Sequence, residues 1–260
     1  MQKITEIDIK LIEEKKARVA AKNNLLAFTC YTKPNYKVNC HHEVMCHALD
    51  DFAAGKIKNL MISAPTRHGK SELVSRRLPA FIFGKYPDRK IIATSYADSL
   101  AWEMTKDVQR IMDSNLYNNI FPDTNLLNDR IKLDKRERWI KTLRKFEIVR
   151  KEGTYRGSGI RGGIAGKGCD YLLIDDYLKN YKEAQSKTIK NEIWNEYLNT
   201  LSYRLEGAKQ TLITATRGAA DDLHGRILKT SKKEPSLQPI SITNSSRLTF
   251  PLKYLTISGI

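Results

Sequence analysis

The sequence has few of the features that mark secreted or membrane proteins. No apolar run approaches the length that spans a bilayer, and the charged residues 1–16 lack the hydrophobic core of a signal peptide. Only four cysteines are present, and they form no disulfide framework, as is usual in a reducing compartment. These absences exclude the disulfide-rich secreted class and the membrane-spanning class, so we expect a cytoplasmic protein.

Standard metal-binding spacing and internal repeats are also missing. Cysteines and histidines do cluster in one short segment, but their spacing matches no usual zinc pattern, and zinc is the weaker interpretation of this segment. The absence of repeats excludes a solenoid. The clustered residues are Cys40, His41, His42, Cys46 and His47.

Acidic residues are scarce relative to basic ones. The 260 residues include 45 Lys plus Arg against 29 Asp plus Glu, a formal net charge of +16. Such an excess favours a polyanionic partner, and nucleic acid is the leading choice, although a merely soluble basic surface is the plain alternative. The length suffices for one large α/β domain, or for a core domain with appendages.

The clearest motif is a phosphate-binding loop. The apolar run Leu60–Ile62 predicts a buried strand, and a short turn follows before a helix begins at Gly69-Lys70-Ser71. This is the pattern G-x-x-x-x-G-K-S/T with Ala64 in place of the first glycine. The alternative is a helix that simply begins with Gly-Lys-Ser. The residues predicted to bind nucleotide are Ala64, Pro65, Thr66, Arg67, His68, Gly69, Lys70 and Ser71.

The residue types in this loop suit triphosphate chemistry. Gly69 lets the backbone approach a phosphate closely, and amides at the helix N-terminus point at it. The ammonium group of Lys70 neutralises β and γ oxygens, and the Ser71 hydroxyl is a suitable Mg²⁺ ligand. ATP and Mg²⁺ are therefore the predicted cofactors.

A pair of carboxylates follows a second apolar strand. Asp175 and Asp176 come directly after Tyr171–Ile174, so they are expected at the carboxyl edge of a parallel sheet, where ligands bind. Asp175 is predicted to hold Mg²⁺ through water, and Asp176 to orient or deprotonate the attacking water. A turn that happens to begin with two aspartates is the alternative.

Alternating elements indicate the fold class. Strands are expected at 57–63, 90–95, 146–150, 171–174 and 210–215, and helices at 4–22, 40–54, 71–83, 97–112, 183–205 and 221–228. This order predicts an α/β protein with a mainly parallel sheet flanked by helices. Loops are expected at 28–36 and at the glycine-rich segment 153–168, which we interpret as a functional loop over the phosphates.

Three regions follow from this order. We expect an N-terminal helix at 1–24, a P-loop ATPase domain at 25–230 and an irregular tail at 231–260. The segment 113–144 forms an excursion from the sheet. Residues 134–145, at the end of this segment, are strongly basic. This charge indicates either a solvated charged face or a DNA contact.

These motifs together resemble the ATPase domain of the large subunit of tailed-bacteriophage terminases, the motors that pump DNA into procapsids. The resemblance covers about residues 25–229 and implies an additional-strand (ASCE) P-loop NTPase fold. It also implies double-stranded DNA, a portal protein and a small terminase subunit as partners, a homo-oligomeric ring, and a location in the bacterial host cytoplasm. The similar stretches are 36–42, 64–72, 84–101, 163–176 and 211–228.

The resemblance also implies roles for single residues. Lys70 and Ser71 would bind triphosphate and Mg²⁺, and Arg67 would touch the γ-phosphate. Asp175 would be the metal-binding acid and Asp176 the catalytic carboxylate. Each of these positions lies inside a matching stretch.

Further implied contacts lie outside the phosphate loop. Thr214 to Thr216 match the motif that couples hydrolysis to movement. Tyr36, His41 and His42 lie where the family contacts adenine, although polar residues at a helix start are the plain alternative for the histidines. A ring motor also needs an arginine from a neighbouring subunit. Arg161 is the first candidate and Arg204 the second.

The sequence departs from the family at its end. Family members commonly continue into an RNase H-like nuclease domain, whereas the tail 231–260 shows no acidic triad, so we expect no DNA cleavage by this chain. Two other functions stay open. One is a different DNA-dependent ATPase, although a two-core helicase would need a longer chain. The other is a non-catalytic prophage remnant that binds nucleotide or DNA.

Overall fold

One mixed sheet organises the part of the chain that the computed structural model describes: residues 6–128, 131–132, 134, 137–162, 164, 168–233, 239–241 and 252–256. Within these residues the sheet has eight strands in the order β3-β4-β2-β5-β6-β1-β8-β7. Every pairing is parallel except β3 with β4, which is antiparallel. The strands are β1 (Asn59–Ser63), β2 (Lys90–Ser95), β3 (Lys145–Glu147), β4 (Thr154–Gly159), β5 (Cys169–Asp175), β6 (Leu205–Ala215), β7 (Pro239–Ser241) and β8 (Leu252–Thr256).

The central strands are the apolar runs of the sequence. Because helices cover both faces of a parallel sheet, such strands are continuously hydrophobic, and β5 is buried at every residue except Asp170. Strand β6 lies between β1 and β5, with Leu212 opposite Leu60 on one side and Leu173 on the other. This inserted strand is the additional-strand arrangement, and it confirms the predicted fold class.

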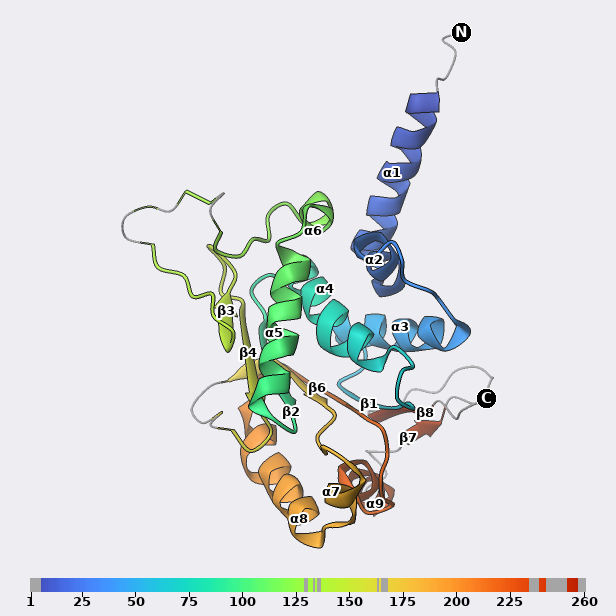
Figure 1. Ribbon diagram of the computed structural model, residues 1–260, viewed down its shortest axis with the longest axis vertical. Coiled ribbons are helices and arrows are strands. Elements are labelled where there is room, and N and C mark those ends of the chain that lie inside the picture. The colour runs from blue at the N-terminus through green and yellow to red at the C-terminus, as the bar shows by residue number, and fades with distance from the viewer. Residues whose placement is uncertain are drawn as a thin grey trace.

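Helices form a layer on each face of the sheet (Figure 1). Helices α2 to α6 pack on one face around a large core cluster, and α8, η2 and α9 pack on the other around a second cluster. Helix α1 extends away from the body, and no described helix is both long and apolar enough to cross a membrane. The helices are α1 (Glu6–Asn23), α2 (Leu25–Thr32), α3 (Cys40–Ala53), η1 (Glu72–Arg77), α4 (Leu78–Lys85), α5 (Asp98–Met112), α6 (Asn115–Ile120), α7 (Tyr181–Gln185), α8 (Lys187–Glu196), η2 (Tyr197–Leu201), η3 (Ser202–Arg204) and α9 (Leu223–Lys233).

The helix after the phosphate loop continues through Pro79, as predicted, but not as a uniform α-helix. Its residues Glu72–Arg77 form the π-helical segment η1 before α4 begins. Proline has no N–H to bond the carbonyl four residues earlier, and a wider turn just before it accommodates that missing bond.

The predicted loop at 28–36 is wrong over its first part, because α2 occupies Leu25–Thr32. The Asn24 side chain accepts a hydrogen bond from the Ala27 amide at 2.9 Å and caps this helix. Phe28 is fully buried against three aromatic rings, so tertiary packing stabilises a short helix that the aromatic sequence did not indicate.

The single helix predicted at 183–205 is also wrong. Ser186 has an extended backbone, separates α7 from α8, and caps α8 by accepting from the Ile189 amide at 3.4 Å. Residues 197–204 then continue as the π turn η2 and the 3-10 turn η3. A serine cap inside an amphipathic pattern was therefore the overlooked signal.

Part of the predicted glycine-rich loop is a strand. β4 occupies Thr154–Gly159, next to β2. A Cβ atom on Gly157 would lie 2.3 Å from Thr105 Oγ1 and 2.7 Å from the Ala101 carbonyl oxygen of α5. The glycine is thus required for close packing between a strand and a helix, rather than for loop mobility.

The predicted irregular tail contains two described strands. β8 pairs in parallel with β1, and β7 pairs with β8. Without β8 the backbone groups on one side of β1 would be unpaired, so hydrogen bonding to the sheet edge orders this segment. The excursion at 113–144 contains the short helix α6, and the strand predicted at 146–150 is shorter, at Lys145–Glu147.

Removing the Leu212 side chain should destabilise this architecture. Leu212 is fully buried in the strand between β1 and β5, so Leu212→Ala should lower the free energy of unfolding by about 2–5 kcal/mol. The matched control is Ile7→Ala on α1, where the side chain is 77% exposed. Urea denaturation measures both variants, and equal losses would contradict the assignment of β6 to the core.

Candidate nucleotide-binding site

The phosphate loop joins β1 to the helix that follows it. Gly69 has a φ of +73°, and a Cβ atom there would lie 2.6 Å from His42 Nε2. Arg67 also has a left-handed backbone, with a φ of 64°, and its side chain is exposed. Left-handed non-glycine residues are strained and concentrate at functional sites. The loop therefore has a tight, specified conformation although Ala64 replaces its first glycine.

Lys70 links the phosphate loop to the ends of β5 and β6. Its Nζ donates to Asp176 Oδ1 at 2.7 Å and to Thr216 Oγ1 at 3.2 Å. The lysine side chain is 5% exposed, whereas the Asp176 side chain is 36% exposed. Thr216 in turn donates to the carbonyl oxygen of Ala64 at 3.1 Å. Four predicted site residues, from three segments that are far apart in the sequence, therefore meet at one rim of the sheet.

Asp175 lies beneath this rim and is almost fully buried. Its Oδ2 accepts a 2.5 Å hydrogen bond from Ser75 Oγ, a residue of η1 that the sequence did not suggest. Burial, together with the neighbouring Asp176, raises the pKa of Asp175 to about 6. The Ser75 hydrogen bond, Lys70 and the Ser71 hydroxyl oppose this rise.

The acidic pair fits a magnesium site in which a bound phosphate would supply some of the ligands. Asp175 Oδ1 is buried and, within the described residues, has no hydrogen-bond partner, so it is an available oxygen ligand. Among the same residues no group of three or more His, Cys, Asp or Glu side chains could hold a metal ion. Mg²⁺ commonly binds one or two protein groups plus phosphate oxygens, so Ser71 and Asp175 suffice as its protein ligands.

An aromatic group stands beside the phosphate loop. The rings of Tyr36 and His42 are 5.1 Å apart, those of His41 and His42 4.1 Å, and those of His41 and His68 5.4 Å. A Cβ on Gly69 would lie 3.1 Å from the Tyr36 hydroxyl. The three residues predicted near adenine therefore lie together against the loop.

His42 also belongs to the start of α3. Its Nδ1 accepts a hydrogen bond from the Asn39 amide at 3.2 Å, so His42 has the helix-start role of the plain alternative, and the adenine contact stays a prediction. Burial lowers the pKa of His42, which favours the neutral ring. Tyr36 Oη, His41 Nε2 and His42 Nε2 are buried, and no partner for them exists in the described part of the chain.

Two other predicted site residues, Thr214 and Arg161, form no hydrogen bond or ion pair with Lys70 among the described residues. Thr214 is buried in β6, opposite Asp175 in the register, and its Oγ1 has no hydrogen-bond partner among the residues described. Arg161 follows β4, is half-exposed, and donates to Glu192 of α8 at 3.0 Å. The structure therefore brings Thr214 to the site, but Arg161 contacts α8 within its own chain.

A buried contact between Tyr177 and His224 was missed by the sequence reasoning. Tyr177 follows Asp176, whose φ is 44°, and its hydroxyl lies 2.8 Å from His224 Nδ1 on α9. Their rings are stacked with centroids 5.6 Å apart. A hydrogen bond with the backbone of Ile62 in β1 also raises the pKa of the His224 imidazole. His224 therefore contacts both the residue after the acidic pair and the strand before the phosphate loop.

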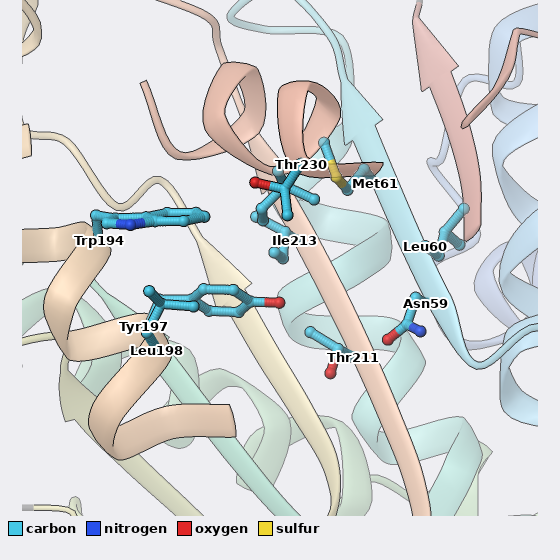
Figure 2. A pocket seen from close by; sticks show the side chains of 10 residues that line it. Asn59, Leu60, Met61, Trp194, Tyr197, Leu198, Thr211, Ile213 and Thr230 are labelled. Atoms are coloured by element: carbon cyan, nitrogen blue, oxygen red, sulfur yellow. The ribbon is translucent and has the colours of Figure 1, made fainter. Parts of the chain in front are cut away.

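An apolar pocket of about 200 Å³ lies elsewhere on the sheet, beside the first residues of β1 and the second half of β6 (Figure 2). Trp194 and Tyr197 of α8 and η2 face Ile213 and Met61 across it. None of its lining residues belongs to the phosphate loop or the acidic pair. Without a charged side chain this pocket offers no catalytic group, so the candidate site is the polar rim around Lys70.

The buried His224 makes stability depend on pH. Burial lowers its pKa to about 4, whereas an unfolded histidine titrates at about 6.5. The unfolded state therefore binds the proton more readily, and stability should fall as the pH is lowered from 6.5 towards 4. His224→Asn should flatten this decline in urea denaturation, whereas the exposed control His47→Asn should not. Identical pH profiles for wild type and His224→Asn would contradict the assignment.

Comparisons with known proteins agree with these motifs. The family model described as terminase large subunit, T4likevirus-type, N-terminal, matches residues 61–245. No curated protein matches the sequence. The crystal structure of the HK97 bacteriophage large terminase is similar, with a TM-score of 0.49 and 13% identity, and the match covers 77% of this chain but 38% of that one. Because the family model spans more than half of the chain, the protein belongs to the terminase large-subunit family.

Proposed function

We propose that this chain is an ATP-hydrolysing motor subunit that packages viral double-stranded DNA into procapsids. The observation that supports this most directly is the contact of Lys70 with both Asp176 and Thr216, since it joins three separate motifs at one point. Family membership supports the packaging role. The proposal concerns the motor activity and assigns no nuclease to the described residues.

The phosphate loop would bind the triphosphate. The Lys70 ammonium would neutralise β and γ oxygens, and backbone amides from Gly69 onward would point at them. Arg67, exposed at the tip of the loop, would contact the γ-phosphate. The remaining loop residues, Ala64, Pro65, Thr66 and His68, would shape the cradle.

The ion pair between Lys70 and Asp176 would exchange when ATP binds. In the described structure Lys70 neutralises Asp176 at 2.7 Å. A triphosphate would compete for the lysine because its charge is greater, and Asp176 would then be available to orient the attacking water and accept its proton. Thr214 and Thr216 would sense the γ-phosphate, because Thr216 shares the same lysine.

Bound Mg²⁺ would supply charge stabilisation for the transferring phosphoryl group. On the protein side, Ser71 and Asp175 would hold the ion. Ser75 would fix the orientation of Asp175 through its hydrogen bond. The buried Asp175 Oδ1, which has no hydrogen-bond partner among the described residues, would gain the ion as its partner.

The aromatic group beside the loop would contact the base. Tyr36, His41 and His42 form a polar and aromatic wall next to Gly69. The His42 Nδ1 already accepts from the Asn39 amide, so its neutral ring would offer the Nε2–H as a donor to a base nitrogen. The three buried polar atoms without partners in the described chain are the groups that a base could satisfy.

Assembly would complete the motor. A homo-oligomeric ring at the portal would let an arginine from one subunit reach the site of the next, and Arg161 is the first candidate for this role. To act in this way Arg161 must leave its contact with Glu192. The expected setting is the bacterial host cytoplasm, with a small terminase subunit and the portal protein as partners.

A non-catalytic nucleotide-binding protein is the competing function. The replacement of the first loop glycine by Ala64 favours it, as does an aspartate at position 176, where many such ATPases have glutamate. The contact between Lys70 and Asp176 argues against it, because it brings the lysine of the loop together with the proposed catalytic carboxylate. Nucleotide binding without turnover would decide for the alternative.

Removing the lysine should abolish hydrolysis. Lys70→Ala should eliminate Mg²⁺- and DNA-dependent phosphate release, because the charge that neutralises the triphosphate is lost. The matched control is Lys56→Ala, an exposed lysine of the α3–β1 connection, which should retain wild-type activity. Phosphate release is measured at high protein concentration. The proposal would be refuted if the wild-type protein released no more phosphate than Lys70→Ala.

The role of Asp176 can be separated from binding. Asp176→Asn should bind ATP with near wild-type affinity yet hydrolyse it about 10²- to 10⁴-fold more slowly, because an amide cannot accept the proton from water. Fluorescent nucleotide titration measures affinity, and single-turnover phosphate release measures the chemical step. Wild-type turnover in this variant would remove Asp176 from the mechanism.

A further inference from the structure

A basic cleft lies at the β3–β4 edge of the sheet. Figure 1 shows this edge beside α5, and it is far along the strand order from β7 and β8. Its volume is about 340 Å³. We call it the edge cleft, and its lining residues are Asp98, Trp102, Arg144, Lys145, Arg156, Gly157 and Ser158. None of these residues belongs to the phosphate loop or the acidic pair.

Two cations in the edge cleft stand directly opposite each other. Lys145 of β3 pairs with Arg156 of β4 in the antiparallel register. Like charges at such positions are destabilising. Lys145 is compensated by an ion pair with Glu147, but in the described part of the chain no carboxylate pairs with Arg156. A fold that keeps an unneutralised cation next to another one has a surface suited to an anionic ligand.

Arg144 adds a third cation in a fixed orientation. Its guanidinium lies over the Trp102 ring, 4.5 Å from the centroid. This contact holds the planar group and leaves the N–H donors at its edge accessible, because the arginine is exposed. Among the described residues it forms no ion pair with a carboxylate. Arginine in this state is suited to bidentate phosphate binding.

The edge cleft continues into a second hollow of about 380 Å³. Lys145 and Arg156 line both spaces, and the second adds Lys90 of β2, which is exposed. Cations from three neighbouring strands, β3, β4 and β2, thus line the two spaces, from the sheet edge inward. An elongated row of separated cations matches the repeated charges of a polymer better than a single small anion.

Acidic residues also line these spaces, but they leave the central cations unpaired. Asp98 uses its Oδ1 to accept from the Gly159 amide at 2.6 Å. Glu147 is paired with Lys145, and Glu206 lines the second space only. The cationic centre is therefore formed by Arg144 and Arg156.

We propose that the edge cleft binds the phosphodiester backbone of duplex DNA, with Arg144 and Arg156 as its principal phosphate contacts. This inference rests on the proposed motor function, which makes duplex DNA the relevant polyanion. It gives a physical role to part of the basic segment 134–145, whose charge was otherwise open to a plain solvated interpretation. Phosphate contacts of this kind position the protein on DNA without reading sequence.

The edge cleft also connects to the acidic pair through backbone contacts. Asp98 holds Gly159, and the next amide, of Ile160, donates to the Ser95 carbonyl oxygen at 2.6 Å. Ser95 Oγ donates to the Asp176 carbonyl oxygen at 3.3 Å, and the Tyr96 amide donates to it at 3.1 Å. DNA at the edge cleft would thus act on the strand ends that hold Asp176, and it should stimulate hydrolysis.

The test compares two double variants with the same change in net charge. Arg144→Gln with Arg156→Gln removes the cleft cations, and Lys10→Gln with Arg110→Gln removes exposed cations that already form ion pairs. Binding to a fluorescein-labelled 30-base-pair duplex is measured by anisotropy at several salt concentrations. The cleft variant should bind about tenfold or more weakly, and its salt slope should fall by about 2. The control should keep the wild-type slope.

Three further measurements make the result decisive. Arg144→Lys with Arg156→Lys should restore most of the salt slope, because the charges return. DNA-stimulated phosphate release should fall in the glutamine variant while fluorescent nucleotide affinity stays unchanged. Circular dichroism melting checks that each variant is folded.

The possible outcomes separate this inference from the proposed function. Wild-type DNA affinity and salt slope in the glutamine variant would overturn the edge cleft as the contact. Preference for single-stranded DNA or duplex RNA over duplex DNA would overturn the assigned partner. If the wild-type protein bound duplex DNA through these arginines but never hydrolysed ATP, the motor function would fail and the cleft would stand.

Discussion

The ion pair between Lys70 and Asp176 is the contact on which the candidate site depends. The lysine is nearly buried, so its charge must be balanced inside the protein, and the aspartate provides that balance at 2.7 Å. The pair spans the phosphate loop and the end of β5, and Thr216 adds the end of β6 to the same ammonium group. A ligand that replaces the aspartate around this lysine would alter three strand ends at once.

The sheet explains why this pair forms. Strand β6 separates β1 from β5, so the lysine reaches across one inserted strand to the aspartate. Parallel strands place their carboxyl ends at a common rim, and Ser75 holds the buried Asp175 beneath it. On the other side of the same rim, His224 and Tyr177 fix the backbone that follows Asp176. Buried polar contacts of this kind specify one arrangement because each leaves an unpaired group if broken.

Compared with those at the rim around Lys70, the charged residues at the β3–β4 edge of the sheet are arranged differently. There Arg144 and Arg156 lie at the surface beside Trp102 and form no ion pair within the described residues, whereas the cation at the rim is neutralised internally. A buried paired lysine suits a small ligand that displaces its partner. An exposed arginine beside a half-buried one, neither with an ion pair among the described residues, suits a polymer whose phosphates arrive from solvent. The two basic sites of this fold thus differ in the ligands that they would accept.

The sequence alone determined the local pattern: the loop with its Gly-Lys-Ser end that we predict to bind phosphate, the two aspartates after an apolar strand, and the α/β class with its parallel strands. These follow from short-range rules, because residue type and spacing decide where a loop, a strand or a helix end forms. Only the tertiary structure decided that Phe28 stabilises a helix, that Gly157 packs in a strand, that β8 completes the edge of β1, and that His224 contacts Tyr177. Those outcomes depend on contacts between residues far apart in the chain, and local propensity is too weak to predict them.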